Sequence, residues 1–145
     1  MSEILVRPAR TADVRAIREL VDTYSRDGRL LSKATVTLFE DIQEFLIAEL
    51  DGEVVGCGAL HVMWEDLAEV RTVAVAPAYA RRGIGSVLLT ALMERAREVG
   101  VQRVFCLTFM VRFFEAHGFV EIGETPVDHD VYQQLLQSYD EGVAE

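Results

Sequence analysis

Residues that mark metal or redox chemistry are scarce in this chain of 145 residues, which has two cysteines and three histidines. Cys57 and Cys106 both lie in apolar runs that predict strands, and no CxxC spacing accompanies them. His61, His117 and His129 are dispersed along the sequence and are each interpreted as structural or exposed. We therefore expect buried, reduced thiols and no metal.

Long apolar runs and an excess of basic residues are also absent. No stretch reaches the roughly 18 consecutive apolar residues of a membrane span, and the start of the chain lacks the features of a secretory signal. These absences predict a cytoplasmic protein without a membrane partner. Fourteen Lys and Arg stand against 24 Asp and Glu, a formal net charge of −10. Binding of nucleic acid needs many Lys and Arg contacts to phosphates, so none is expected, whereas one small anionic ligand is compatible with this charge.

The composition is that of one packed globular domain. Half of the residues are hydrophobic and 26% are charged, which excludes a disordered chain. The length is close to the commonest size of a domain, so we expect a single domain over residues 1–145.

Hydrophobic periodicity predicts strands that alternate with helices. The Asp51-Gly52 pair between two apolar runs is typical of a hairpin turn. Strands are expected at 4–7, 45–50, 53–62, 68–75, 101–108 and 119–122. Helices are expected from residue 11 to Gly28, at 37–43 behind a Thr37–Glu40 capping box, from a glycine-rich turn to Gly100, at 112–117 and at 128–139. This order predicts an α/β fold with a mixed, mostly antiparallel, twisted sheet and helices on both faces, in which strand 101–108 is buried on both sides.

The turn ARRGIGS, between strand 68–75 and the next helix, carries the most chemical information. Gly83 and Gly85 remove side-chain obstruction, so the backbone amides of residues 81–86 can face outward at a helix N-terminus and bind a pyrophosphate. A tight turn with a flexible helix cap is the plainer alternative. A dinucleotide-binding fold would need a third glycine where Leu88 stands, and the phosphate loop of ATPases is absent.

With the preceding VAVAP and the later FFEAHGF, this turn resembles the GNAT family of acetyl-CoA-dependent N-acetyltransferases, over about residues 4–123. The resemblance implies a GNAT-like acyl-CoA N-acyltransferase fold, acetyl-CoA as co-substrate and a homodimer. It implies that strand backbone pairs with the pantetheine arm and that the loop amides hold the pyrophosphate. The cofactor-binding residues implied are Val73, Ala74, Val75, Arg81, Arg82, Gly83, Ile84, Gly85, Ser86 and Phe114. Where Phe114 stands the family often has Tyr as a proton donor to the leaving thiolate, and Phe cannot donate.

The resemblance also implies a catalytic residue, Glu69, as the base that removes a proton from the acceptor amine. Strand alternation is expected to place Glu69, Arg71 and Val73 on one face, with a backbone N–H near Val73 polarising the acetyl carbonyl. The alternative for Glu69 is a surface carboxylate at a strand end. The thiol of CoA leaves without a strong acid, since its pKa should be near that of cysteine, about 8.5.

Within the family, the chain is most similar to the short amino-acid acetyltransferases that make N-acetylglutamate in the first step of bacterial arginine biosynthesis. The segments that carry this similarity are VVGCGALHV, DLAEVRTVAV and RVFCLTFMVRFFEAHGF. It implies a small amino-acid substrate, L-glutamate or L-glutamine, bound by Lys33, Arg71, Thr108 and Arg112, since Lys and Arg can pair with its carboxylates. Each of these cations could equally be a solvated charge.

Two further interpretations stay open. One is acetylation of a protein or peptide amine, and the other is a noncatalytic acyl-CoA sensor, which Phe114 favours. Proteins of the resembling group continue into a last strand, and that strand is expected to be missing from this chain, which also favours the sensor.

Overall fold

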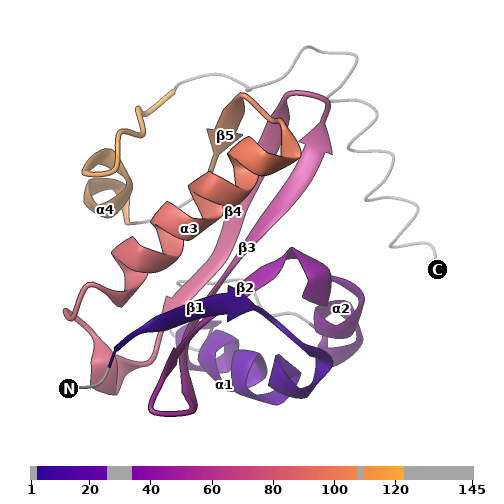
Figure 1. The fold of residues 1–145 in the computed structure, drawn as a ribbon. Coiled ribbons are helices and arrows are strands. Elements are labelled where there is room, and N and C mark those ends of the chain that lie inside the picture. The colour runs from indigo at the N-terminus through magenta and orange to yellow at the C-terminus, as the bar shows by residue number, and fades with distance from the viewer. Residues whose placement is uncertain (1–2, 26–33, 108–109, 123–145) are drawn as a thin grey trace.

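The computed structural model describes residues 3–25, 34–107 and 110–122, in which five strands form one sheet in the order β1-β2-β3-β4-β5 (Figure 1). The strands are β1 (Leu5–Pro8), β2 (Phe45–Leu50), β3 (Glu53–Trp64), β4 (Leu67–Val75) and β5 (Arg103–Phe105). The helices are α1 (Val14–Ser25), α2 (Thr35–Glu40), α3 (Ile84–Val99) and α4 (Val111–Glu115), with 3-10 turns η1 (Thr11–Asp13), η2 (Ile42–Glu44) and η3 (Pro77–Tyr79).

The sheet is mixed and mostly antiparallel, which confirms the predicted fold class. Strands β1 to β4 pair antiparallel, and β4 pairs with β5 in parallel. The β2–β3 hairpin turns at Asp51 and Gly52, whose φ angles of 52° and 79° are those of the primed turn that the sequence predicts.

Helices cover both faces of this sheet (Figure 1). Helix α3 packs on one face, where Leu88, Leu89 and Leu92 are fully buried. Helices α1 and α2 pack on the other, around Ile17 and Leu38, which are also fully buried. Because each helix presents one apolar stripe, the two layers of side chains form the core.

A β-bulge interrupts β4 at Thr72. Cys57 of β3 faces Ala74 and Ala59 faces Arg71, so Thr72 and Val73 together oppose Gly58. Thr72 has a φ of 59°, a left-handed conformation that is costly for a β-branched residue. The bulge reverses the alternation of side chains along the strand.

The prediction that Glu69, Arg71 and Val73 share a face is therefore wrong. Arg71 lies opposite Ala59, which belongs to the core on the α1 side, and Glu69 lies two residues before it on the same face. Val73 packs with the cluster under α3, on the other face.

Three local predictions differ from the structure. Within the described part of the predicted strand 101–108, only Arg103–Phe105 forms a strand, β5, and it is not buried on both sides. Residues 119–122, predicted as a strand, are not in a strand. Leu107, just after β5, is 83% exposed. The capping box is also wrong: α2 begins at Thr35, and Glu40 is its last residue. The predicted helix 128–139 lies outside the described residues.

A charge network that the sequence analysis missed joins the first elements. Arg7 of β1 contacts Asp13 through two hydrogen bonds of 2.9 and 3.1 Å and Glu49 of β2 through one of 3.2 Å. The Arg7 guanidinium holds the pKa of Asp13 below its usual range. A separate finding is that no helix in the described part of the chain is long and apolar enough to cross a membrane.

Candidate active site

The turn that leads into α3 has the geometry of an anion-binding loop. Arg81 and Gly83 have φ angles of 63° and 80°, and Arg82 between them does not share the positive sign. Such alternation directs successive N–H groups toward one side, forming a concavity for an anion. Among the described residues, the amides of 81–86 donate no hydrogen bond to another backbone group. These free amides stand at the N-terminus of a 16-residue helix, where the helix dipole also favours negative charge.

Side chains around this turn are arranged so that its surface stays open. Arg81, Arg82 and Gly83 are exposed, and a Cβ built on Gly83 would meet nothing within 4 Å. Gly85 has a different surrounding, because a Cβ there would lie 3.4 Å from the ring of Phe113 in α4. The turn therefore needs Gly83 for its conformation, whereas a Cβ at Gly85 would lie in ordinary van der Waals contact with Phe113.

Beside this turn, one edge of β4 has no strand neighbour in the described part of the chain. The parallel pairing with β5 covers only Leu67, Ala68 and Glu69. From Val70 to Val75 no strand of the described residues pairs with that edge, so its backbone groups that are not otherwise bonded can pair with an extended ligand, as the sequence analysis expects of Val73 and Val75. The carbonyl of Val75 accepts a hydrogen bond from the hydroxyl of Tyr24 in α1.

A polar cluster lies on the α1–α2 side of β3 and β4 and consists of Glu44, His61, Glu69 and Arg71. Glu44 lies at the end of η2 and joins two of the others: Oε2 is 2.9 Å from His61 Nδ1, and Oε1 is 3.4 Å from Arg71 Nη2. Arg71 Nη1 lies 3.8 Å from Glu69 Oε1, and His61 is the direct cross-strand partner of Glu69. Two carboxylates thus flank one guanidinium.

Burial and charge act against each other in this cluster. Partial burial alone would raise the pKa of Glu44, but the hydrogen bond from His61 and the charge of Arg71 outweigh it, so the pKa of Glu44 is lowered. Glu69 is only 8% exposed and is nevertheless close to Arg71. Burial, with the nearby charge of Glu69, raises the pKa of the Cys106 thiol to about 11, so this thiol is neutral near pH 7.

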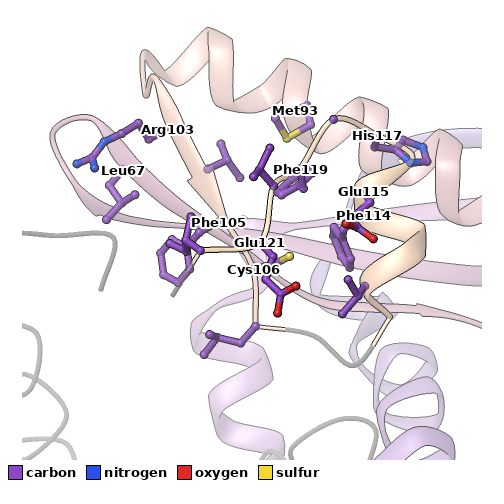
Figure 2. A pocket seen from close by; sticks show the side chains of 16 residues that line it. Leu67, Met93, Arg103, Phe105, Cys106, Phe114, Glu115, His117, Phe119 and Glu121 are labelled. Atoms are coloured by element: carbon purple, nitrogen blue, oxygen red, sulfur yellow. The ribbon is translucent and has the colours of Figure 1, made fainter. Parts of the chain in front are cut away.

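A hollow of about 750 Å³ lies elsewhere, between β5, α4 and residues 117–122. Figure 2 shows Phe105 and Cys106 on one side of it and Phe114 on the other. Of the predicted site residues that the structure describes, it holds Phe114 alone. Phe114 is buried and makes edge contacts with Phe113 and Phe119, so it serves the packing of α4.

The structure brings the predicted residues into two groups on one strand and its following turn. Glu69 and Arg71 meet in the polar cluster, and the residues predicted to bind the cofactor follow the bulge. Arg112 is exposed on α4 and has no ion-pair partner among the described residues. Lys33 and Thr108 lie outside the described residues. No group of three or more His, Cys, Asp or Glu side chains in the described ranges could hold a metal ion.

Sequence reasoning missed Glu44 and His61. A signal for His61 was present in the sequence, because alternation along β3 places it on the same face of the sheet as Ala59. On the neighbouring strand β4, Glu69 is its cross-strand partner. Glu44 had no such signal, since it lies in a 3-10 turn between the predicted helix 37–43 and the predicted strand 45–50.

The sequence and the fold of this chain are similar to those of known acetyltransferases. The profile of the acetyltransferase (GNAT) family matches residues 14–119. An amino-acid acetyltransferase of Mycobacterium tuberculosis is 55% identical over 145 residues, which cover 97% of this chain and 82% of that protein. The crystal structure of Rv2747 from Mycobacterium tuberculosis, in complex with CoA and NLQ, has a TM-score of 0.90 and 55% identity over 97% of this chain and 86% of that one.

A longer protein shares the same architecture. N-acetylglutamate synthase from Neisseria gonorrhoeae, complexed with coenzyme A and N-acetyl-glutamate, has a TM-score of 0.84 and 28% identity over 94% of this chain. The match spans only 32% of that protein, so the similarity concerns one part of it.

Proposed function

This chain belongs to the GNAT family of acetyltransferases, and on that basis we propose that it transfers an acetyl group from acetyl-CoA to the α-amino group of a small amino acid, L-glutamate or L-glutamine. This reaction is the one that begins arginine biosynthesis in the group that the sequence resembles. The observation that carries the proposal is the sequence of features along β4 and its following turn: a buried carboxylate, a guanidinium, a bulge, an open strand edge and a row of free amides.

The donor side of the site fits acetyl-CoA. The amides of residues 81–86 and the exposed Arg81 and Arg82 suit a pyrophosphate, and the free edge of β4 at Val73 to Val75 suits the amide groups of a pantetheine arm. Gly83 keeps the approach to these amides clear. When bound, acetyl-CoA supplies a thioester whose carbonyl is open to attack and whose thiol is a good leaving group.

The chain's own residues supply acid–base chemistry on the acceptor side. An amino acid arrives mainly as an ammonium ion, so a proton must leave before its nitrogen can attack. Glu69 is the base in this proposal, since it is buried on the face that carries Arg71. A backbone N–H near Val73 stabilises the charge that develops on the acyl oxygen. Phe114 donates no proton, which a thiol pKa of about 8.5 makes tolerable.

The acceptor's carboxylates are assigned to Arg71 on this face and to the other cations that the sequence predicts. Arg71 is held by Glu44 and Glu69 and can still offer its remaining N–H groups to a carboxylate. Lys33, Thr108 and Arg112 complete the proposed substrate-binding set. Anionic amino acids suit these cations better than a protein or peptide amine does.

A thiol-release assay with acetyl-CoA across the twenty amino acids tests the function. We expect glutamate or glutamine to give the highest kcat/KM, with the mass of the product showing one added acetyl group. Tight binding of acetyl-CoA without turnover on any amino acid would instead indicate an acyl-CoA sensor. Turnover only on peptides would identify a protein acetyltransferase.

The role of Glu69 has its own test. Glu69→Gln keeps the size of the side chain but removes the base, so kcat should fall roughly 10²-fold while the affinity for acetyl-CoA stays within about twofold. Glu65→Gln, an exposed neighbour in the β3–β4 turn, is the matched control and should retain wild-type rates. Unchanged rates across pH for Glu69→Gln would remove Glu69 from the mechanism.

A further inference from the structure

The polar cluster contains an imidazole that the proposed mechanism does not use. His61 lies directly opposite Glu69 on the neighbouring strand, and such cross-strand pairs have Cβ atoms about 5 Å apart. Its side chain is 31% exposed, whereas that of Glu69 is 10% exposed. His61 therefore stands between a buried carboxylate and solvent.

Glu44 determines which nitrogen of His61 is free. Its Oε2 lies 2.9 Å from Nδ1, and an ionised carboxylate can only accept a hydrogen bond, so Nδ1 must carry the proton. In neutral imidazole this leaves Nε2 with its lone pair. Nε2 has no hydrogen-bond partner among the described residues. A carboxylate that orients an imidazole in this way is a general arrangement for a proton acceptor.

A buried carboxylate that takes a proton must then release it. Glu69 returns to its charged form only if the proton reaches water, and little of its side chain touches solvent. An imidazole can accept a proton on one nitrogen and give it up to solvent, so a partly exposed histidine suits this task.

We propose that His61, oriented by Glu44, is the relay that carries the acceptor's proton from Glu69 to solvent. The inference rests on the proposed acetyl transfer. One proton of the acceptor's ammonium group passes to the Glu69 carboxylate and then to Nε2, which leaves a neutral amine. The amine nitrogen then forms the new N–C(acyl) bond, the C–S bond breaks with its electron pair staying on sulfur, and the second proton that the nitrogen loses protonates this sulfur. The imidazolium gives its proton to water. Among the described residues, the charged groups around His61 are Glu44 from η2 and Glu69 and Arg71 from β4. His61 acts through Glu69 and is thus a positioning residue of the site.

The first test compares pH profiles of kcat for the wild type and His61→Gln, in which the amide can still donate to Glu44. We expect kcat to fall at least roughly tenfold near pH 7, and the inflection in the imidazole range to disappear, with KM for acetyl-CoA within about twofold. His117→Gln is the matched control, because His117 bonds its own helix at the carbonyl of Phe113 and should leave the profile unchanged. A His61→Gln profile identical to that of the wild type would overturn the relay.

A second measurement needs no variant. The ¹⁵N NMR spectrum of the wild-type chain should show the tautomer with the proton on Nδ1 at pH 7.5. In Glu44→Gln the side-chain amide can donate to Nδ1 as well as accept from it, so the preference for this tautomer should weaken. The proton on Nε2 in the wild type would overturn the relay even if His61→Gln failed to fold. If the wild type acetylates no amino acid, the proposed function is wrong and the relay is wrong with it. If the wild type is active but carries the proton on Nε2, only the relay is wrong.

Discussion

Arg71 is the residue whose surroundings bear most directly on substrate choice. Its guanidinium lies 3.4 Å from Glu44 and 3.8 Å from Glu69, so part of its charge is already compensated. A substrate carboxylate bound there would share Arg71 with these two acids. Affinity at this position therefore depends on the geometry of the guanidinium as well as on its charge.

Truncating Arg71 should weaken binding of the acceptor. In Arg71→Ala we expect KM for glutamate to rise at least about tenfold, with a smaller rise for glutamine if Arg71 contacts the side-chain carboxylate. Arg71→Lys keeps the charge but loses the planar guanidinium, so its KM for glutamate should lie between that of the wild type and that of Arg71→Ala. Steady-state kinetics with both amino acids measure the effect.

The control for Arg71 is Arg95→Ala, an exposed position on α3 that should change neither KM. Equal losses for glutamate and glutamine would assign Arg71 to the shared α-carboxylate. No loss for either would mean that Arg71 is a structural cation between Glu44 and Glu69.

Individual residues were predictable where their chemistry followed from position on one strand. Glu69 and Arg71 follow from β4 and from the resemblance, because alternation is a local property. Alternation along β3 gives the face of His61 but not the residues that it meets. Glu44 joins the cluster only through contacts between elements, and a spacing rule within one segment carries no information about such contacts. The placement of Val73 failed for a related reason: the bulge at Thr72 depends on pairing with Gly58 in another strand.

At the scale of elements, the turn into α3 offers a clean test of anion binding. Gly83 has a φ of 80° and open space around it, and Asn and Asp are the residues that best tolerate this conformation after glycine. Gly83→Asp and Gly83→Asn have nearly the same shape and differ in one negative charge. The pair therefore separates backbone strain from electrostatics.

We expect Gly83→Asp to bind acetyl-CoA at least about tenfold more weakly than Gly83→Asn at low salt, because the added carboxylate repels the pyrophosphate. The dependence of the melting temperature on acetyl-CoA concentration measures both affinities. Gly85 is unsuitable for this comparison, since a side chain there would push against Phe113. Equal affinities of the two Gly83 variants for acetyl-CoA would contradict binding of the pyrophosphate at this turn.

Elements defined by their own residues were predicted well. The β2–β3 hairpin follows from Asp51-Gly52, and α3 ends at Gly100, whose φ of 104° only glycine adopts readily. Residues 101–108 and 119–122 failed because an apolar run becomes a strand only when a partner is present, and their apolar composition does not reveal that partner.

At the scale of the whole molecule, the pH dependence of the free energy of unfolding includes a contribution from a thiol in the core. Cys57 of β3 is fully buried among the side chains under α1, and its Sγ lies 3.3 Å from the carbonyl of Thr72 at the bulge. Burial raises the pKa of the Cys57 thiol to about 12. The folded protein therefore keeps this group neutral at pH values where the unfolded chain ionises it.

This difference predicts a loss of stability in alkali. An unfolded thiol has a pKa of about 8.5, so between pH 9 and 12 the unfolded chain binds fewer protons than the folded one. The contribution of Cys57 to the free energy of unfolding should therefore fall by up to about 1.4 kcal/mol per pH unit.

The variant Cys57→Ala lacks this contribution. Its free energy of unfolding, measured in urea from pH 7 to 11, should fall less steeply than that of the wild type above pH 9. The four tyrosines and the one lysine, Lys33, ionise equally in both proteins and cancel in the comparison. Cys106→Ala, which removes a half-buried thiol, should change the slope less. Parallel curves for the wild type and Cys57→Ala would mean that water reaches the thiol and that the core around the bulge is open in solution.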